Sequence, residues 1–278
     1  MKNIVITGVS TGIGYHTAQL FCEKGFRVFG SVRKESDAQK LKVALGDNFE
    51  PMIFDVVDNK AILEAAQMVK KAINTEGVSL LINNAGIAVS GPLQHLDTDE
   101  LIHQFNVNVI GVQRVTQAFL PMLGATFNKD VPKGKIINIS SVSAIITTPF
   151  LGPYCASKAA LNSLTDALRR ELSLFGIPVV LIQPGPIKTP IWDKARAETN
   201  MYEGTEYEKV FKNAQKSIDQ SEKQAIDTPV VAELVFKIYN TSNPKTRYTI
   251  IKNKPIIKLV SWLPPKWMDF LLKKRLSN

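Results

Sequence analysis

Short apolar runs alternate with longer amphipathic stretches along most of the chain. The apolar runs are typical of buried strands and occupy residues 4–6, 26–32, 49–54, 80–82, 136–139, 179–182 and 247–251. The stretches between them repeat apolar side chains at helical spacing, at residues 13–24, up to 45, 59–76, 97–123, 153–175 and 229–239. Strands that alternate with helices predict a parallel sheet covered on both faces, because right-handed crossovers place the helices there. We therefore expect a single-domain, doubly wound α/β fold with about seven strands.

The alternation lapses between residues 186 and 228, where the sequence is polar and charged and has weak helical periodicity. A long segment of this kind in a compact domain is usually a lid or a binding loop. We therefore expect residues 1–250 to form one nucleotide-binding domain that includes a substrate loop at 186–228. Residues 251–278 would be a basic, amphipathic C-terminal extension of the same domain.

The composition suits a protein with one large apolar core, since 45% of the 278 residues are hydrophobic and 21% are charged. The first apolar run is far too short for the core of a signal peptide or for a membrane span. The two cysteines, Cys22 and Cys155, fall in predicted helices without metal-ligand spacing. These features predict a cytoplasmic protein that holds no metal.

The net charge of +9 is concentrated near the C-terminus. Residues 245–278 carry seven lysines and two arginines against one aspartate, whereas the rest of the chain has 25 basic and 24 acidic residues. A protein that binds nucleic acid would more often spread its basic residues over a groove or a recognition helix, and the sequence has no such motif. We therefore expect no nucleic-acid partner.

The C-terminal segment mixes its basic residues with large apolar ones, namely Ile256, Ile257, Leu259, Val260, Trp262, Leu263, Trp267, Met268, Phe270, Leu271 and Leu272. Pro264 and Pro265 interrupt it, so no single helix here would span a bilayer. Four interpretations stay open: docking on its own domain, a lid over an apolar substrate cleft, a subunit contact, or peripheral contact with an anionic membrane, where each basic residue adds about 1 kcal/mol. Between lid and membrane contact we prefer the lid, because the expected pocket otherwise lacks a wall on that side.

The first predicted strand and helix are joined by a glycine-rich turn, Thr7-Gly8-Val9-Ser10-Thr11-Gly12-Ile13-Gly14. Glycines are needed where the backbone turns sharply and approaches a pyrophosphate, whose charge is stabilised by free amides and by the positive end of the following helix. Such a turn by itself is weak evidence. Its place between a strand and a helix is what a dinucleotide site requires.

A tyrosine and a lysine, Tyr154 and Lys158, stand four residues apart in a predicted helix, with Ser141 thirteen residues before the tyrosine. Residues at this spacing share one helix face, so the ammonium can lie beside the phenol. A free tyrosine has a pKa near 10, and acid–base work near neutrality needs that pKa to fall by roughly 3 units. A nearby ammonium shifts the pKa in that direction.

Three further blocks keep fixed places relative to the strands: Asn83-Asn84-Ala85-Gly86 after the fourth, Asn106-Val107-Asn108-Val109-Ile110-Gly111 in a helix, and Pro184-Gly185-Pro186-Ile187-Lys188-Thr189 after the sixth. Each alone would be an ordinary turn, helix or strand exit. In this order, and with the glycine turn and the tyrosine–lysine pair, they resemble the short-chain dehydrogenase/reductase family. The hydroxysteroid and retinol dehydrogenase branch is the most similar, and the likeness covers residues 1 to about 190.

The resemblance implies a Rossmann fold and assigns four catalytic residues, Asn108, Ser141, Tyr154 and Lys158. Asn106 is a nearby alternative to Asn108, and Ser140 and Ser143 compete for the serine role, although the spacing to the tyrosine favours Ser141. In reduction, Tyr154 would act as general acid and Ser141 would polarise the carbonyl. Lys158 would lower the pKa of the tyrosine and hold the nicotinamide ribose, and Asn108 would support a proton relay.

The resemblance also implies which residues bind the cofactor: Gly8, Ser10, Thr11, Gly12, Ile13, Gly14, Arg33, Asp55, Val56, Asn84, Ala85, Gly86, Tyr154, Lys158, Pro184, Gly185, Ile187 and Thr189. An acid at the end of the second strand binds the 2'-hydroxyl of NAD, whereas a nearby arginine suits the 2'-phosphate of NADP. Val32 occupies the position where an NAD enzyme of the family would carry Asp, and Arg33 follows it. We therefore expect NADP(H) to be preferred over NAD(H), with a merely solvated Arg33 as the alternative.

The expected function is the NADP(H)-dependent interconversion of a carbonyl and an alcohol on a lipophilic small molecule. The lipophilic character is indicated by apolar residues in the loop and tail, among them Ile191, Trp192 and Met201. The alternative is a non-catalytic nucleotide-binding or membrane-associated scaffold on the same fold. Relatives commonly pair through two long helices, which here end near Leu123 and Phe175, so a homodimer or homotetramer is expected.

Overall fold

The computed structural model describes residues 1–126, 131–190, 192, 202–252 and 262–277, and of residues 212–217 and 274–277 the backbone alone. Its centre is a seven-stranded sheet of β1 (Asn3–Ile6), β2 (Arg27–Val32), β3 (Phe49–Ile53), β4 (Val78–Asn83), β5 (Lys135–Ile139), β6 (Val179–Pro184) and β7 (Arg247–Ile250). The strand order is β3-β2-β1-β4-β5-β6-β7 and every pair is parallel. The predicted doubly wound sheet is confirmed, and its order reverses between β1 and β4, the place where such sheets bind ligands.

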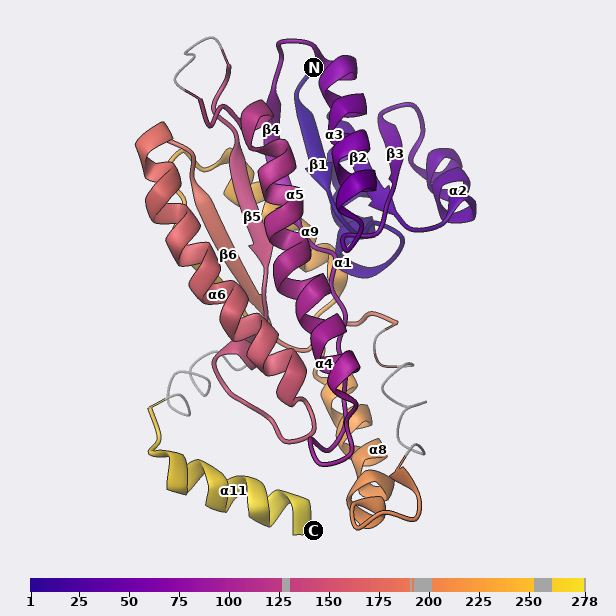
Figure 1. Ribbon diagram of the computed structural model, residues 1–278, viewed down its shortest axis with the longest axis vertical. Helices are drawn as coiled ribbons and strands as arrows, with labels where there is room; N and C mark the ends of the chain where they lie inside the picture. The colour runs from indigo at the N-terminus through magenta and orange to yellow at the C-terminus, as the bar shows by residue number, and fades with distance from the viewer. Residues whose placement is uncertain (127–130, 191, 193–201, 253–261, 278) are drawn as a thin grey trace.

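Helices cover both faces of the sheet (Figure 1). They are α1 (Gly12–Glu23), α2 (Glu35–Leu45), α3 (Asn59–Ile73), α4 (Thr98–Phe105), α5 (Val112–Phe119), α6 (Gly152–Leu172), α8 (Glu208–Lys223), α9 (Thr228–Asn240) and α11 (Pro265–Ser277). On one face Phe119 of α5 packs in a core that contains Val5, and on the other Phe21 and Val235 of α1 and α9 pack in a core that contains Ile4. Because both strand faces are buried, the strands appear in the sequence as continuous apolar runs.

Two stretches differ from the sequence-based expectation. The helix predicted over residues 97–123 consists of α4, a π-helical turn at Asn106–Gly111, α5 and a 3-10 turn at Leu120–Leu123. A π turn inserts one extra residue, which barely disturbs the apolar periodicity. The predicted loop at 186–228 contains the helix α8. This helix was not predicted, because its sequence is so highly charged. Six of the residues named there and in the tail as apolar lie outside the described residues, namely Ile191, Met201, Ile256, Ile257, Leu259 and Val260.

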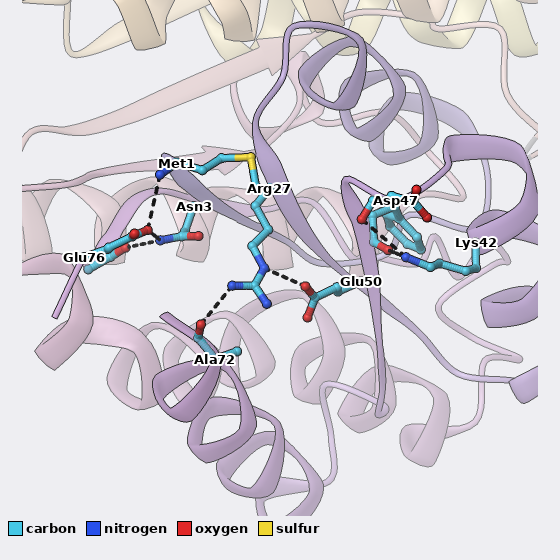
Figure 2. A network of polar contacts seen from close by, with 10 residues as sticks. Met1, Asn3, Arg27, Lys42, Asp47, Glu50, Ala72 and Glu76 are labelled. Carbon is cyan, nitrogen blue, oxygen red and sulfur yellow. Dashed lines mark hydrogen bonds and ion pairs between the residues drawn. The ribbon is translucent and has the colours of Figure 1, made fainter. Parts of the chain in front are cut away.

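A network of polar contacts ties the strands together at the edge where they begin (Figure 2). Arg27, the first residue of β2, donates to Glu50 at 2.5 Å and to the carbonyl of Ala72 at 2.8 Å. Asn3 of β1 donates to Glu76 at 3.3 Å and to the carbonyl of Gly77 at 3.0 Å. This edge is opposite the carboxyl ends of the strands, so these charged groups stabilise the sheet and lie away from the motif residues.

Candidate active site

The glycine-rich turn is held by the block that follows β4. Asn84 Nδ2 donates to the carbonyls of Thr7 and Gly8, both at 2.9 Å. In return, the Thr7 hydroxyl accepts from the backbone amides of Asn84 and Ala85, both at 3.0 Å. The structure therefore places Asn84 and Ala85 against the turn, as the sequence predicts. Thr7 is a positioning residue that sequence reasoning missed, because a threonine at a strand end carries no spacing signal.

The turn leaves the first amides of α1 available to a ligand. Gly8 and Gly12 have φ values of 70° and 65°, which glycine adopts without strain. Thr11 at the N-cap makes no side-chain cap hydrogen bond, and no acidic residue lies in the first turn of the helix. The first turn of α1 itself therefore supplies no carboxylate to neutralise its positive end. These features fit the pyrophosphate of a dinucleotide, because free amides and the helix dipole both favour an anion there.

Gly14 is the tightest position in the turn. A Cβ at this residue would lie 2.2 Å from the carbonyl oxygen of Gly8 and 2.5 Å from Nδ2 of Asn84. The atom it would meet first is backbone, so the clash is relieved only by moving the turn that faces the cofactor. The third glycine of the motif is therefore required by packing between α1 and the ends of β1 and β4.

We expect Gly14→Ala to lower the free energy of unfolding by about 3 kcal/mol and Tm by roughly 6–12 °C, with a large loss of NADPH affinity. Calorimetry and fluorescence titration measure the two effects. Gly25→Asn is the matched control, because Gly25 has open space around it and asparagine tolerates its φ of 79°. An alanine variant as stable as the unchanged protein would contradict the steric argument.

The segment after β6 lies against the glycine turn. A Cβ at Gly12 would lie 3.1 Å from Cγ2 of Thr189, which places these two residues side by side. Ile187 is buried and its carbonyl accepts from Trp192 Nε1 at 2.8 Å. Gly185 approaches Ile251 so closely that a Cβ would lie 2.7 Å from it. The predicted Pro184 to Thr189 block therefore forms one side of the same site as the glycine turn.

The ends of β2 and β3 bring Arg33 and Asp55 together. Arg33 Nη1 lies 3.9 Å from Asp55 Oδ2, and the Arg33 side chain is 71% exposed. Asp55 is itself oriented by the amide of Val57, which donates to Oδ1 at 3.1 Å. The Ser31 hydroxyl accepts from the amide of Gly8 at 3.0 Å, which links β2 to the glycine turn. A basic group thus stands at the edge where an adenosine 2'-phosphate would lie.

The catalytic candidates meet at the carboxyl ends of β5 and β4. Tyr154 forms a hydrogen bond with the side chain of Ser141. Lys158 Nζ lies 5.8 Å from the centroid of the Tyr154 ring and donates to the carbonyl of Ile139 at 2.9 Å. A Cβ at Gly86 would lie 3.5 Å from Lys158 Nζ, so the lysine reaches the block after β4. The i, i+4 spacing on α6 therefore places phenol and ammonium on one face, as predicted.

The partners of Ser140 and Ser141 separate these two serines, and Asn108 is placed by its burial and its neighbours. Ser140 Oγ donates to Asn162 at 2.6 Å, whereas Ser141 Oγ accepts from the amide of Ser143 at 3.1 Å and pairs with the tyrosine. Asn108 is fully buried, and a Cβ at Gly86 would lie 3.2 Å from its Oδ1. The geometry thus places Ser141 and Asn108 with the tyrosine–lysine pair.

Asn108 is held by groups that sequence reasoning missed. Its Oδ1 accepts from the amide of Ile87 at 2.9 Å, and its Nδ2 donates to the Ile87 carbonyl at 3.0 Å and to Ser157 Oγ at 3.1 Å. Gln104 Nε2 donates to Ser157 and to the same carbonyl. Ser157 lies between Tyr154 and Lys158 in sequence, yet nothing in its spacing distinguishes it from an ordinary helical serine.

Burial is the main cause of the pKa shifts of both Tyr154 and Lys158. Burial raises the pKa of Tyr154, and its hydrogen bond with Ser141 opposes this shift only in part. Burial also lowers the pKa of Lys158 from 10.5 to about 8. The lowered tyrosine pKa expected from the sequence is therefore absent in the protein alone, because desolvation outweighs the hydrogen bond with Ser141. The phenol is protonated at neutral pH and suits the donation of a proton.

Comparisons with known proteins agree with this geometry. A family model described as short chain dehydrogenase matches residues 2–200. The chain is 40% identical to the NADPH-dependent 3-dehydrocapnine reductase of Ornithobacterium rhinotracheale, over 100% of this chain and 98% of that protein. It is 32% identical to the 3-ketodihydrosphingosine reductase of Bacteroides thetaiotaomicron (97% and 96% covered) and 30% identical to retinol dehydrogenase 16 of Mus musculus (98% and 87% covered).

Proposed function

Because this chain belongs to the short-chain dehydrogenase family and is an oxidoreductase that interconverts a carbonyl and an alcohol, we propose that Tyr154 exchanges the proton with the substrate oxygen. NADP(H) supplies or accepts the hydride at the carbonyl carbon when it is bound. Ser141 donates a hydrogen bond to the same oxygen and holds it beside the phenol. In reduction the carbonyl carbon gains hydride, the oxygen takes the proton of Tyr154, and the product is an alcohol.

The observation that carries this proposal is the meeting of the Ser141 hydroxyl, the Tyr154 phenol and the Lys158 ammonium at the strand ends. Lys158 is charged below pH about 8 and stabilises the phenolate that remains after proton transfer. Asn108, anchored on Ile87 and Ser157, keeps the π-helical turn close to the lysine. These residues would together return a proton to Tyr154 after each turnover.

The cofactor is NADP(H) in preference to NAD(H). Support comes from the name of the 40% identical reductase and from Arg33 beside buried Val32 at the end of β2. Asp55 holds the guanidinium loosely, at 3.9 Å, which leaves its other donors for a phosphate. The Arg33 position therefore provides the charge that distinguishes the two cofactors.

We expect Arg33→Ala to weaken NADPH binding about tenfold and to leave NADH binding nearly unchanged. The expected loss of affinity is at the lower end of what a hydrogen bond to a charged group contributes, because the Arg33 side chain is exposed and screened by solvent. Fluorescence titration of both cofactors measures the ratio, and Lys34→Ala, a change at the neighbouring exposed base, is the control. Equal losses for the two cofactors would exclude Arg33 as the phosphate ligand.

The substrate that we propose is a ketone carried on a long apolar molecule. Two of the relatives are by name reductases of 3-dehydrocapnine and of 3-ketodihydrosphingosine, and a third acts on retinol. Aromatic residues lie close to the tyrosine in this part of the molecule: the ring of Phe211 of α8 packs against those of Phe150, four residues before the tyrosine, and of Tyr202, with centroids 5.0 Å and 4.6 Å apart. We infer that this apolar segment faces the substrate, which would favour an aliphatic chain over a polar ketone.

Loss of NADPH absorbance tests the activity directly, with 3-dehydrocapnine, 3-ketodihydrosphingosine and a short water-soluble ketone as substrates. We expect kcat/KM to be highest for the two long-chain ketones. If NADPH binds but no carbonyl is reduced, the alternative of a non-catalytic nucleotide-binding protein is correct. If only the short ketone is reduced, the reaction holds and the substrate class is wrong.

We further propose that the protein is a homodimer or homotetramer in the cytoplasm. Ile102 on α4 and Ile110 in the π-helical turn are 52% and 43% exposed on the helices through which relatives pair, and a subunit contact would cover them. Cys22 and Cys155 are free and buried, which suits a reducing compartment. Light scattering should give a multiple of 30.8 kDa, and cell fractionation locates the protein.

A further inference from the structure

The C-terminal segment exposes more large apolar surface than any other short part of the described chain. Trp262 is 88% exposed, Trp267 66%, Phe270 68% and Leu271 49%, all within ten residues. Exposed apolar residues elsewhere, such as Val43 on α2, are scattered singly, as is normal for a soluble protein. Clustered exposure of aromatic residues marks a surface that contacts something else.

The exposed residues share one face of α11. Trp267, Phe270 and Leu271 stand at positions i, i+3 and i+4 of the helix, so they form one stripe. Met268 and Leu272, on another side of the helix, are partly covered. A lid closed over a substrate cleft, or a terminus docked on its own domain, would bury the aromatic stripe. The structure instead directs it to the outside, and we call Trp267, Phe270 and Leu271 the aromatic face of α11, with the exposed Trp262 just before the helix.

The charge around the aromatic face is strongly positive. Lys266 and Lys273 of α11 are exposed beside it, and residues 245–278 carry nine basic residues against the single Asp269. Two copies of so basic a segment repel each other, which disfavours self-association through this face. An anionic lipid surface attracts it, and tryptophan and phenylalanine are the side chains that insert most readily at the boundary between headgroups and acyl chains.

We propose that the aromatic face of α11 docks the protein on an anionic membrane surface. The contact is peripheral: within the described ranges no helix is both long and apolar enough to cross a bilayer. Trp267, Phe270 and Leu271 enter the headgroup boundary, and the lysines beside them pair with lipid phosphates. Both forces act on the same surface of the same helix.

The position of α11 in the molecule indicates a role for the membrane contact. In Figure 1, α11 lies beyond the carboxyl ends of the strands, at the end of the molecule that carries the active site. Docking there turns the active-site end toward the lipid, from which a long-chain ketone can be taken up. This role rests on the proposed substrate class, whereas the docking itself does not.

Co-sedimentation with vesicles tests the docking without substrate or turnover, so its result is independent of the proposed reaction. The unchanged protein should bind vesicles of phosphatidylcholine with phosphatidylglycerol far better than vesicles of phosphatidylcholine alone, and less well at high salt. The triple variant Trp267→Ser, Phe270→Ser and Leu271→Ser should lose at least tenfold in vesicle affinity, which is a lower limit because even partial burial of three apolar side chains is worth more than a factor of ten. The matched control is Val43→Ser with Leu174→Ser, which alters two apolar residues elsewhere that are even more exposed, 87% and 84%.

Two further measurements separate the possible results. NADPH titration confirms that the triple variant is folded, and tryptophan quenching by lipids brominated near the headgroup should occur in the unchanged protein and decrease in the variant. Absence of vesicle binding by the unchanged protein, or equal binding by the triple variant, would overturn the proposal. So would a light-scattering mass that falls in the triple variant, because the face would then be a subunit contact.

Discussion

Tyr154→Phe is expected to lower kcat by about two to four orders of magnitude while NADPH binding and folding stay intact. Phenylalanine keeps the ring that packs on α6 and removes the hydroxyl that pairs with Ser141 and gives its proton to the substrate oxygen. Single-turnover absorbance with saturating NADPH measures the loss.

The matched control for this variant is Tyr207→Phe. Tyr207 donates its hydroxyl to Gln94 at 3.2 Å on the loop side of the molecule, so the change removes a more exposed phenol that has no place in the proton transfer. Its kcat should change less than threefold or so. If the Tyr154 variant retained more than a tenth of the activity, roughly, another group would have to be the proton donor.

Lys158→Met should reduce both turnover and cofactor affinity, because one ammonium serves both. Methionine is close to the lysine side chain in length and leaves the buried site without an unpaired charge. We expect kcat to fall by about 10²-fold or more and the Kd of NADPH to rise about tenfold or more. A variant that lost turnover alone would show that Lys158 acts on the phenol and does not contact the cofactor.

The same lysine predicts a pH dependence. Its pKa in the protein is about 8, so it is charged below this pH and neutral above it. NADPH affinity should therefore be constant at lower pH and fall as the pH rises through about 8, by up to about tenfold at one unit above. In Lys158→Met the dependence should disappear. If the NADPH affinity of this variant still fell as the pH rose through about 8, the titrating group would have to be another residue.

The fold could be predicted because its strands are buried on both sides. Ile4 to Ile6 and Val179 to Ile182 are continuous apolar runs for that reason, and Gly25 ends the first helix with a φ of 79°. The π turn at Asn106–Gly111 could not be predicted in this way. One inserted residue changes the hydrogen bonding of the helix while the apolar residues on either side keep nearly the same spacing.

The candidate site was predictable where its residues form ordered blocks. Gly8 to Gly14 and the pair Tyr154 and Lys158 are set by the geometry of one turn and one helix face, which are local properties of the chain. Ser157 and Gln104 could not be predicted, although Ser157 accepts from Asn108 and Gln104 donates to Ser157. They act through contacts across more than forty positions of sequence, and a single polar residue in a helix carries no sign of such a contact.

The sequence by itself determined the parallel sheet, the chain order of the motifs and the chemical groups at the strand ends, because each follows from local periodicity or residue type. Only the tertiary structure decided how those groups are tuned. Packing placed Thr189 against Gly12 and Arg33 near Asp55, and burial raised the pKa of Tyr154, which is opposite to the shift expected from the sequence. It also turned Trp267 and Phe270 outward. Burial and through-space contact depend on segments far apart in sequence, so no local pattern encodes them.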